Sequence, residues 1–373
     1  MPVAPSSDSS PTPEDRSIIT VLDLFAGAGG LSAGLESASK RFRTVTAVEM
    51  EPRAAATFQA NHPGAHVHCG RIEDWLQEES VPQVDLVVGG PPCQGFSALG
   101  KQALDDERNS MWRHYAAAVA AARPRFFVME NVPQFMTSPE YALFKELVEE
   151  DGPLKEYDFT AEVVNAADYG AAQKRRRAIV IGYRKDVGDP GRPVVTHGPT
   201  ARATYRTVRN VIGGLPATTP LPEGRTYEFE GKTFRGPFQT SELHVDRNYS
   251  DLSRKRFKKI KEGGNRFQLP TELQCEAWKK HTTGSGDVMG RLHWDQPSVT
   301  IRTEFTKPEK GRYLHPVLDR AITPREGALL QGFTEEYLFV GSVTQIVKQI
   351  GNAVPIPLGA AIGRLLLPHW ADH

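Results

Sequence analysis

The sequence has few cysteines, no excess of charge of either sign and no long apolar run. Its 373 residues contain three cysteines, and 45 Lys and Arg are balanced by 45 Asp and Glu. Cys69, Cys93 and Cys275 form no closely spaced pair of the kind that binds a metal, and three cysteines cannot make a disulfide framework. We therefore expect a cytoplasmic protein without a metal site, in which each cysteine has to be interpreted alone.

Membrane insertion and secretion are also disfavoured. No apolar stretch approaches the ~20 residues that a membrane-spanning helix needs. Residues 1–17 are rich in Ser, Pro and Asp and lack the apolar centre of a signal peptide, so we expect a disordered tail there. A hydrophobic fraction of 39% and a charged fraction of 24% are ordinary for a globular protein.

The balanced net charge argues weakly against a nucleic-acid partner, but the charges are unevenly distributed. Between His244 and Pro270 the chain has eight Lys or Arg and three Asp or Glu. A basic run that stands alone is more often a solvated surface than a binding site. The motifs around it decide whether it indicates nucleic-acid binding.

Strand patterns alternate with helix patterns in the first half of the chain. Apolar runs predict strands, and the periodic stretches between them predict helices. The strands are expected at residues 18–24, 44–48, 84–88, 126–129, 159–165 and 178–183, and the helices at 31–39, 52–61, 111–122 and 141–149. This rhythm predicts an α/β protein with a Rossmann-like, doubly wound, mostly parallel sheet that has helices on both faces.

The chain length favours one large domain and a smaller one. The alternation covers residues 18–185. Residues 186–290 are rich in Pro, Gly, Arg and Lys with little periodicity, and are expected to be a smaller, irregular domain. Helix patterns return within residues 291–373, which are expected to rejoin the first domain. These patterns lie at residues 324–331 and 343–367, the second with a break around Gly351–Pro357.

A glycine-rich turn follows the first expected strand. Asp23-Leu24-Phe25-Ala26-Gly27-Ala28-Gly29-Gly30 lies where the strand leads into a helix, at the sheet edge where α/β proteins bind ligands. A tight strand–helix turn explains the glycines equally well on their own. However, Glu49 ends the second strand, where an acid accepts hydrogen bonds from the two hydroxyls of a ribose. Because no Walker lysine follows the glycines, a nucleoside cofactor is favoured over a phosphate-bearing one.

A cysteine is expected at the same edge of the sheet. A strand leads through Gly89-Gly90-Pro91-Pro92 to Cys93, in a turn that the prolines restrict. A lone cysteine is usually a buried apolar residue, but this position suits a nucleophile. Glu130 ends the next strand and is expected near Cys93. Arg175 and Arg177 precede the last strand and share a face if its alternation begins there.

Taken in order, these motifs resemble the bacterial type of the DNA cytosine-5 methyltransferase family. The matching segments are Phe25–Gly30, Pro92-Cys93-Gln94, Glu130-Asn131-Val132, Gln173 with Arg175 and Arg177, Arg320, Thr323, Arg325-Glu326, Gln331-Gly332-Phe333 and Gly351–Pro355. The resemblance covers about residues 18–367, and the ordered set is specific because independent matches multiply. It implies an enzyme that methylates C5 of cytosine within a specific double-stranded DNA sequence, using S-adenosylmethionine.

The resemblance implies a catalytic role for four residues. Cys93 would attack C6 of the base as a thiolate, which makes C5 nucleophilic towards the methyl group. Glu130 would hold N3 and the exocyclic amine, and Arg177 would hold O2, where charge develops. Arg175 would support the site or bind a phosphate.

The resemblance also implies contacts to S-adenosylmethionine. Phe25 would stack on the adenine, the Gly27–Gly30 backbone would face the methionine part, and Glu49 would bind the ribose. The expected set is Phe25, Ala26, Gly27, Gly29, Gly30, Leu31, Glu49, Met50, Ile72, Pro92, Asn352 and Val354. One position departs from the family, because Arg71 stands where an acid usually accepts from the adenine amine, with Glu73 or Asp74 as substitutes.

Enzymes of this kind extrude the target base from the duplex, and the resemblance implies where DNA is bound. Residues 94–109 are expected to close over the DNA. Residues 186–290 are expected to be the target-recognition domain, whose basic run suits phosphate contacts. The expected contacts are Gln94, Ser97, Leu99, Arg247, Arg254, Arg256 and Lys258. The expected partner is duplex DNA, and the chain is expected to be a monomer. A cognate restriction endonuclease acting in trans on the same site is compatible with the sequence, which does not decide whether one exists.

Two other functions fit parts of the sequence. One is RNA methylation by the same fold, although the tRNA-modifying branch carries a Cys-Phe-Thr element that is absent here. Neither Cys69 nor Cys275 is placed like the second catalytic cysteine of other RNA cytosine-5 methyltransferases. The other is a non-catalytic DNA-binding regulator, which would have no need of Cys93, Glu130 and Arg177.

Overall fold

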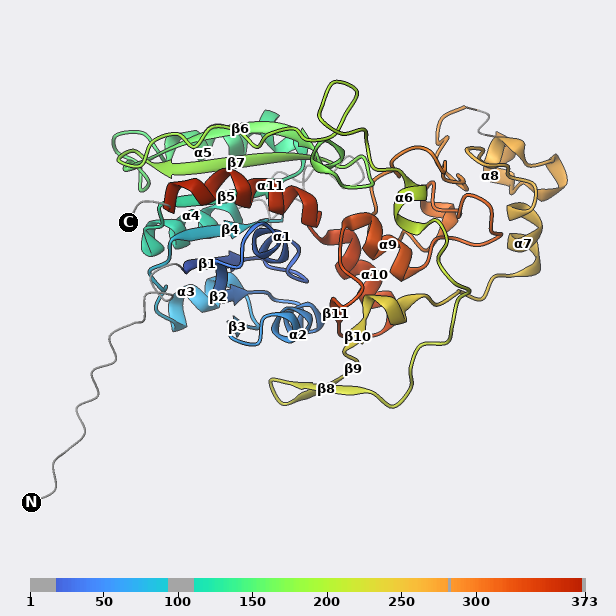
Figure 1. Ribbon diagram of the computed structural model, residues 1–373, viewed down its shortest axis with the longest axis horizontal. Coiled ribbons are helices and arrows are strands. Elements are labelled where there is room, and N and C mark those ends of the chain that lie inside the picture. Colours follow the sequence, from blue (N-terminus) through green and yellow to red (C-terminus); the bar gives the residue numbers. More distant parts are fainter. Residues whose placement is uncertain (1–17, 93–110, 281–282, 371–373) are drawn as a thin grey trace, which may run out of the picture.

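A seven-stranded sheet forms the centre of the structure, a computed structural model that describes residues 18–92, 111–280 and 283–370. Its strand order is β3-β2-β1-β4-β5-β7-β6 (Figure 1). The strands are β1 (Ile19–Leu24), β2 (Phe42–Val48), β3 (His66–His68), β4 (Leu86–Gly89), β5 (Phe126–Asn131), β6 (Tyr157–Asn165) and β7 (Arg176–Arg184). Neighbours from β3 to β5 pair in parallel, and β7 runs antiparallel to both β5 and β6. The predicted mostly parallel, Rossmann-like sheet is confirmed.

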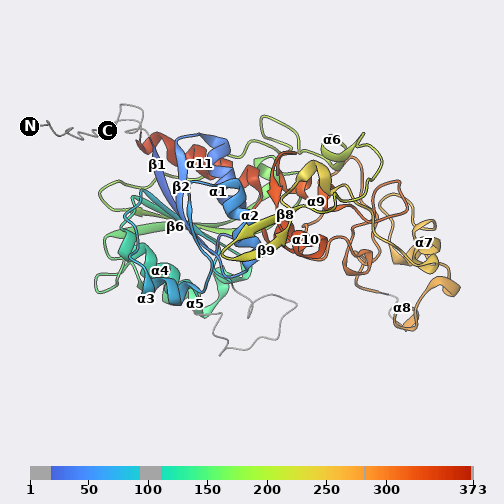
Figure 2. The same ribbon diagram turned by 90° about the horizontal axis from the view of Figure 1, so that it is seen from below.

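Helices cover both faces of this sheet, which is why its central strands are apolar on both sides. On one face, α3, α4 and α5 pack around Trp75, Tyr115 and Phe144; on the other, α1 and α11 pack around Leu35 and Ile362 (Figure 2). The helix bounds are α1 (Gly30–Ala38), α2 (Pro52–Asn61), α3 (Ile72–Glu78), α4 (Met111–Ala122), α5 (Pro139–Glu146), α9 (Pro324–Gln331), α10 (Val343–Asn352) and α11 (Ile356–Leu366).

The predicted helices α2, α4 and α9 have the observed bounds. Helix α2 begins at Pro52, after Glu51 accepts hydrogen bonds from two backbone N–H groups, and α9 begins at Pro324 after a capping box between Thr323 and Glu326. Such end signals are local and can be read from sequence. Strand β3 and helix α3 were not predicted, because a three-residue strand shows too little periodicity.

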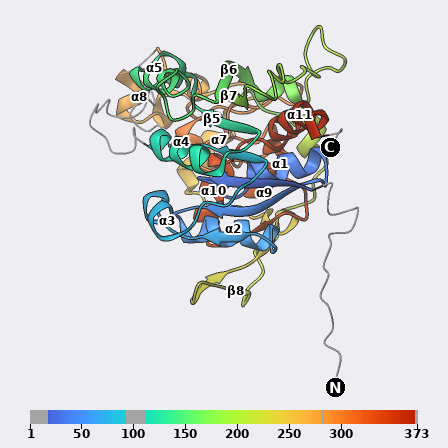
Figure 3. The ribbon, with the colours of Figure 1, turned by 90° about the vertical axis from the view of Figure 1, so that its left-hand side faces the viewer.

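The described part of residues 186–290 forms only short elements, consistent with its weak periodicity. Its α-helices and strands are α6 (Val208–Ile212), β8 (Thr226–Phe229), β9 (Lys232–Arg235), β10 (Phe238–Gln239), α7 (Asp251–Phe257) and α8 (Glu276–Lys280). The β8–β9 hairpin reaches back to the sheet, where Phe229 joins a small cluster with Phe58 of α2 and Val67 of β3. Figure 3 shows this hairpin beside α2.

The C-terminal segment divides between two cores. Helices α9 and α10 share a core with α6 and β10, through residues such as Ile212, Phe238, Leu330 and Ile350, whereas α11 lies against α1 on the sheet. A two-residue strand, β11 (Leu338–Phe339), pairs with β10. The domain limits expected from the sequence remain a prediction.

Contrary to the expectation from the sequence, one described stretch, Val343–Trp370, is long and apolar enough to cross a membrane by length and composition alone. Within it, 67% of the apolar window is buried inside the molecule. The stretch is also interrupted at Ala353–Pro355, between α10 and α11. These features are typical of core helices.

Candidate active site

The turn between β1 and α1 has an uncommon backbone conformation. Phe25, Gly27 and Gly29 have positive φ angles of 56°, 55° and 81°, a region that suits glycine and strains phenylalanine. A Cβ placed on Gly27 would meet no atom within 4 Å. The backbone therefore borders open space at the carboxyl end of β1, which allows a ligand to approach it closely.

The C-terminal segment closes one side of this turn. A Cβ placed on Gly30 would lie 2.5 Å from the carbonyl oxygen of Val354, so glycine is required for the contact. Val354 is half-buried, and Asn352, the last residue of α10, is exposed. The predicted cofactor contacts from opposite ends of the chain are thus brought together.

Glu49 holds the other side of the turn. Its Oε2 accepts a hydrogen bond from Gly27 N at 2.8 Å, and its Oε1 accepts one from Glu51 N at 2.8 Å. The two oxygens of a carboxylate offer about four acceptor sites, so the side chain is able to accept further hydrogen bonds from ligand hydroxyls. Burial is the main reason that the pKa of Glu49 is raised.

The other predicted cofactor residues differ in exposure. Met50, next to Glu49, is 68% exposed, while Phe25, Ala26 and Pro92 are half-buried. The side chains of Leu31 and Ile72 belong to the two cores of the sheet. An aromatic ring, an exposed thioether, a carboxylate with free lone pairs and open glycine backbone together fit an adenine nucleoside that carries an amino-acid tail.

Arg71, which stands where the resembling family usually has an acid, forms an ion pair with Glu73. Arg71 precedes α3, and its Nη2 lies 2.7 Å from Oε1 of Glu73. Asp74 is exposed. Glu73, one of the two suggested substitutes for the missing acid, therefore already has a cationic partner.

The second part of the site joins β5 to β7. Arg177 Nε lies 2.6 Å from Glu130 Oε1, and the two side chains are 16% and 14% exposed. A Cβ placed on Gly90 would be 3.2 Å from Glu130 Oε2. The carboxylate therefore lies against the glycine turn that follows β4, as expected from the shared sheet edge.

Asn131 fixes the end of that turn. Its side chain is buried, its Nδ2 donates to Pro91 O at 3.3 Å, and its Oδ1 accepts from Val132 N at 2.8 Å. Pro91 and Pro92 are the last described residues before Cys93. Cys93 itself, and the predicted DNA contacts Gln94, Ser97 and Leu99, lie outside the described residues.

Arg175 lies in the same neighbourhood but faces the protein. It is 2% exposed, and its Nη1 donates to the carbonyl oxygens of Ile301 and Gly351 at 3.0 Å each. Burial and the charge of Arg177 lower its pKa, and the charge of Glu130 raises it. The guanidinium of Arg175 is thus enclosed by protein, which favours a supporting role over a phosphate contact; both roles stay predictions.

Asp23 is a buried acid near the end of β1, directly before the Phe25–Gly30 turn, and it was not singled out from the sequence. Asp23 Oδ2 accepts from Ser32 Oγ at 2.6 Å, and Ser32 Oγ accepts from Thr44 Oγ1 at 2.8 Å. Burial raises the pKa of Asp23 to about 7. The only sequence signal was the position of Asp23 inside an apolar strand, where a charged residue needs a partner.

The predicted DNA contacts in residues 186–290 are of two kinds. Arg254 and Lys258, in and just after α7, are exposed. Arg256 is partly buried, with its Nε donating to Leu273 O at 2.8 Å and its guanidinium 4.9 Å from the ring centre of Trp278. Arg256 is therefore engaged in packing. Arg254 and Lys258 are exposed, although the Arg254 guanidinium carbon lies 6.0 Å from the ring centre of Tyr249.

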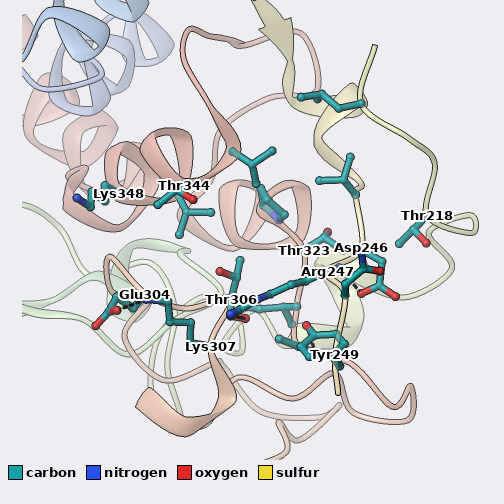
Figure 4. Close-up of a pocket in the computed structure, with 18 of the residues that line it drawn as sticks. Thr218, Asp246, Arg247, Tyr249, Glu304, Thr306, Lys307, Thr323, Thr344 and Lys348 are labelled. Atoms are coloured by element: carbon teal, nitrogen blue, oxygen red, sulfur yellow. Dashed lines mark hydrogen bonds and ion pairs between the residues drawn. The ribbon is translucent and has the colours of Figure 1, made fainter. Parts of the chain in front are cut away.

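Arg247 lines a cavity of about 910 Å³ between residues 245–249, residues 303–307 and helices α9 and α10 (Figure 4). Arg247, Lys307 and Lys348 contribute positive charge, and Asp246 and Glu304 contribute negative charge. The charges nearly cancel, so the cavity has no strong preference for an anion.

An open glycine turn, Phe25–Gly30, and an acid–arginine pair, Glu130 and Arg177, thus lie at one edge of a Rossmann-like sheet. The family model of C-5 cytosine-specific DNA methylases matches residues 19–367. The chain therefore belongs to the family of DNA cytosine-5 methyltransferases, as predicted.

Known relatives agree with this assignment. The Type II methyltransferase M1.HphI of Haemophilus parahaemolyticus is 34% identical over 359 residues, covering 94% of this chain and 87% of the relative. The Type II methyltransferase M.XorII of Xanthomonas oryzae pv. oryzae is 34% identical over 379 residues, covering 92% and 83%. A putative DNA modification methyltransferase encoded within an E. coli prophage has a similar fold, with a TM-score of 0.68 at 23% identity over 93% of this chain and 98% of that one.

Proposed function

We propose that this enzyme methylates C5 of cytosine within a specific double-stranded DNA sequence, through an adduct between Cys93 and C6 of a flipped-out base. The observation that carries the proposal is the Glu130–Arg177 pair, which lies against the glycine turn leading to Cys93. An acid and an arginine that lie together match the polar edge of cytosine, which has an amine and N3 on one side and a carbonyl O2 on the other.

Each residue has a distinct chemical task. The Cys93 thiolate forms a bond to C6, and the electron pair of the C5–C6 double bond becomes available at C5 to take the methyl group. Glu130 hydrogen-bonds the exocyclic amine and holds a proton at N3, while Arg177 donates to O2, so that charge is neutralised as it develops. A base, which the sequence does not identify, then takes the C5 proton; the electron pair of that C–H bond re-forms the C5–C6 double bond, and the C6–S bond breaks to release the Cys93 thiolate.

S-Adenosylmethionine, when bound, supplies the methyl group as a sulfonium. The residues that would hold it are Phe25 against the adenine, Glu49 on the ribose, and the Gly27–Gly30 backbone with Val354 around the methionine part. Support comes from the open space at Gly27 and from the free lone pairs of Glu49. A phosphate-bearing cofactor is less well supported, because no Walker lysine follows the glycines.

DNA binding would involve the exposed charges of Arg254, Lys258 and Arg247, which suit phosphate contacts. Residues 186–290 would be the target-recognition region, and extrusion of the base would cost a few kcal/mol. The Type II names of the relatives support a partner nuclease acting in trans on the same site. We also infer that a monomer acts in the cytoplasm, where bacterial DNA lies.

Bisulfite sequencing of DNA from cells that express this chain tests the proposal. We expect protection of cytosine in one sequence context with the wild-type chain and no protection with Cys93→Ser, which should still bind S-adenosylmethionine. Protection by Cys93→Ser would remove Cys93 from the mechanism. If no DNA context is protected by the wild-type chain, the RNA methyltransferase or the non-catalytic regulator is the better description.

A further inference from the structure

Two side chains, those of Glu49 and Tyr337, hydrogen-bond the backbone of the glycine turn between β1 and α1 (Phe25–Gly30). Only Glu49 belongs to the expected cofactor site. Glu49 accepts from Gly27 N, as described above. On the other side, the hydroxyl of Tyr337 donates to the carbonyl oxygen of Ala28 across a sequence separation of 309 residues. We propose that Tyr337 is a positioning residue for the cofactor, holding the glycine turn in its ligand-binding conformation.

The geometry around Gly29 supports a close fit between Tyr337 and the turn. A Cβ placed on Gly29 would lie 2.8 Å from the Tyr337 hydroxyl, and 3.1 Å and 3.2 Å from Phe58 and His62. Gly29 is therefore required both by its positive φ and by the Tyr337 hydroxyl that lies against it. Burial keeps the pKa of Tyr337 well above its usual range, so the hydroxyl stays protonated and able to donate.

Tyr337 is itself held rigidly. Its ring packs against Phe333 and Phe339, with ring centres 4.7 Å and 5.4 Å away. The backbone of the next residue, Leu338, is bound twice by the side-chain amide of Asn61 in α2. Asn61 Nδ2 donates to Leu338 O at 2.9 Å, and Asn61 Oδ1 accepts from Leu338 N at 3.0 Å. A side chain with so little freedom is able to restrict the backbone group to which it donates.

Tyr337 also connects the glycine turn to residues 186–290. Its carbonyl oxygen accepts from the backbone N–H of Thr240 at 2.9 Å and from the Thr240 hydroxyl at 3.2 Å. Thr240 is fully buried beside β10, which pairs with β11. A displacement of this part of the proposed recognition region would therefore be transmitted through Tyr337 to the cofactor turn.

The inference rests on the proposed use of S-adenosylmethionine, and calorimetric titration of the full chain with that compound tests it. Tyr337→Phe keeps the ring packing and removes the hydroxyl, so we expect the dissociation constant to rise about three- to tenfold, the usual effect of one lost hydrogen bond. The KM for the cofactor should rise similarly, with kcat at saturation nearly unchanged. Thr240→Val should shift both values in the same direction by less, because its backbone N–H remains.

Tyr157→Phe is the matched control, because it also removes a tyrosine hydroxyl that donates to a backbone carbonyl, that of Pro124 at 2.7 Å. Tyr157 belongs to the core on the sheet face covered by α3, α4 and α5. It should lose comparable thermal stability and bind the cofactor like the wild type. Wild-type affinity in Tyr337→Phe, or equal weakening in both variants, would overturn the inference while leaving the proposed function intact. Failure of the wild-type chain to bind S-adenosylmethionine would instead refute the proposed cofactor.

Discussion

Arg177 Nε lies 2.6 Å from Glu130 Oε1, and this ion pair bridges the antiparallel strands β7 and β5 at the edge where the chain leads to Cys93. Both side chains are largely buried, so each charge depends on the other. The pair thus stabilises the fold. In the proposed mechanism the same two side chains hydrogen-bond the polar edge of the base.

Glu130→Gln is expected to lower methyl transfer at least about a hundredfold, because the amide cannot hold a proton at N3. It should also cost about 1–3 kcal/mol of unfolding free energy, since Arg177 loses its charged partner. Methyl transfer to DNA and chemical denaturation measure the two effects. In contrast, Glu156→Gln removes an exposed pair with Arg123 and should change stability by less than about 1 kcal/mol. Near-normal transfer by Glu130→Gln would contradict the assigned role.

Glu49→Gln is expected to weaken S-adenosylmethionine binding about tenfold or more, because the amide group cannot accept from Gly27 N and Glu51 N while also serving two ribose hydroxyls. Burial raises the pKa of Glu49, so its carboxylate is lost as pH falls through that raised value. Wild-type affinity, measured by calorimetry, should therefore decrease as the solution is acidified, and the Gln variant should show a weaker dependence.

Glu79→Gln provides a control for this prediction. Glu79 is also half-buried and accepts from two histidines, His66 and His68, at 2.8 Å each, but it lies after α3 rather than at the glycine turn. Its replacement should leave cofactor affinity unchanged. An equal loss of affinity in the Glu79 and Glu49 variants would show that the effect is not specific to the ribose site.

Asp23→Asn is expected to change how stability depends on pH. The folded pKa of Asp23 is about 7 against a usual 3.8, so between these values the folded chain retains a proton that the unfolded chain has released. Wild-type unfolding free energy should therefore fall as pH rises through this window, by at most about 4 kcal/mol from this group. The Asn variant lacks this contribution. Chemical denaturation at a series of pH values measures the unfolding free energy of both proteins. If the two free energies change with pH by the same amount across this window, the prediction is refuted.

Basic residues of α7 are expected to behave differently according to their packing. Arg254→Gln and Lys258→Gln should weaken DNA binding and reduce the salt dependence of the binding constant by about 0.9 per lost phosphate contact. Arg256→Gln should mainly reduce stability, because Arg256 is bound to Leu273 O and stacked on Trp278. Filter binding over a range of salt concentrations separates these outcomes. Lys40→Gln, an exposed position after α1, should alter neither property.

Several features could be predicted from sequence because their causes are local. The bounds of α2 and α9 follow from their caps and N-terminal prolines. The break between α10 and α11 follows from Pro355, which disfavours a continuous helix. The glycine turn, Glu49 and Glu130 were located because parallel strands place their carboxyl ends at one edge of the sheet, so their positions follow from strand order alone.

The amino-acid sequence by itself determined the alternation of elements, the sheet class and the family, because each is encoded in short-range periodicity or in an ordered series of motifs. Only the tertiary structure decided that Arg175 faces protein carbonyls, that Arg256 donates to the carbonyl oxygen of Leu273, and that Tyr337 reaches the Phe25–Gly30 turn. These contacts join segments that are distant in the chain, and their partners are backbone groups, which every residue carries. No side-chain pattern marks such contacts in advance, so packing alone selects them.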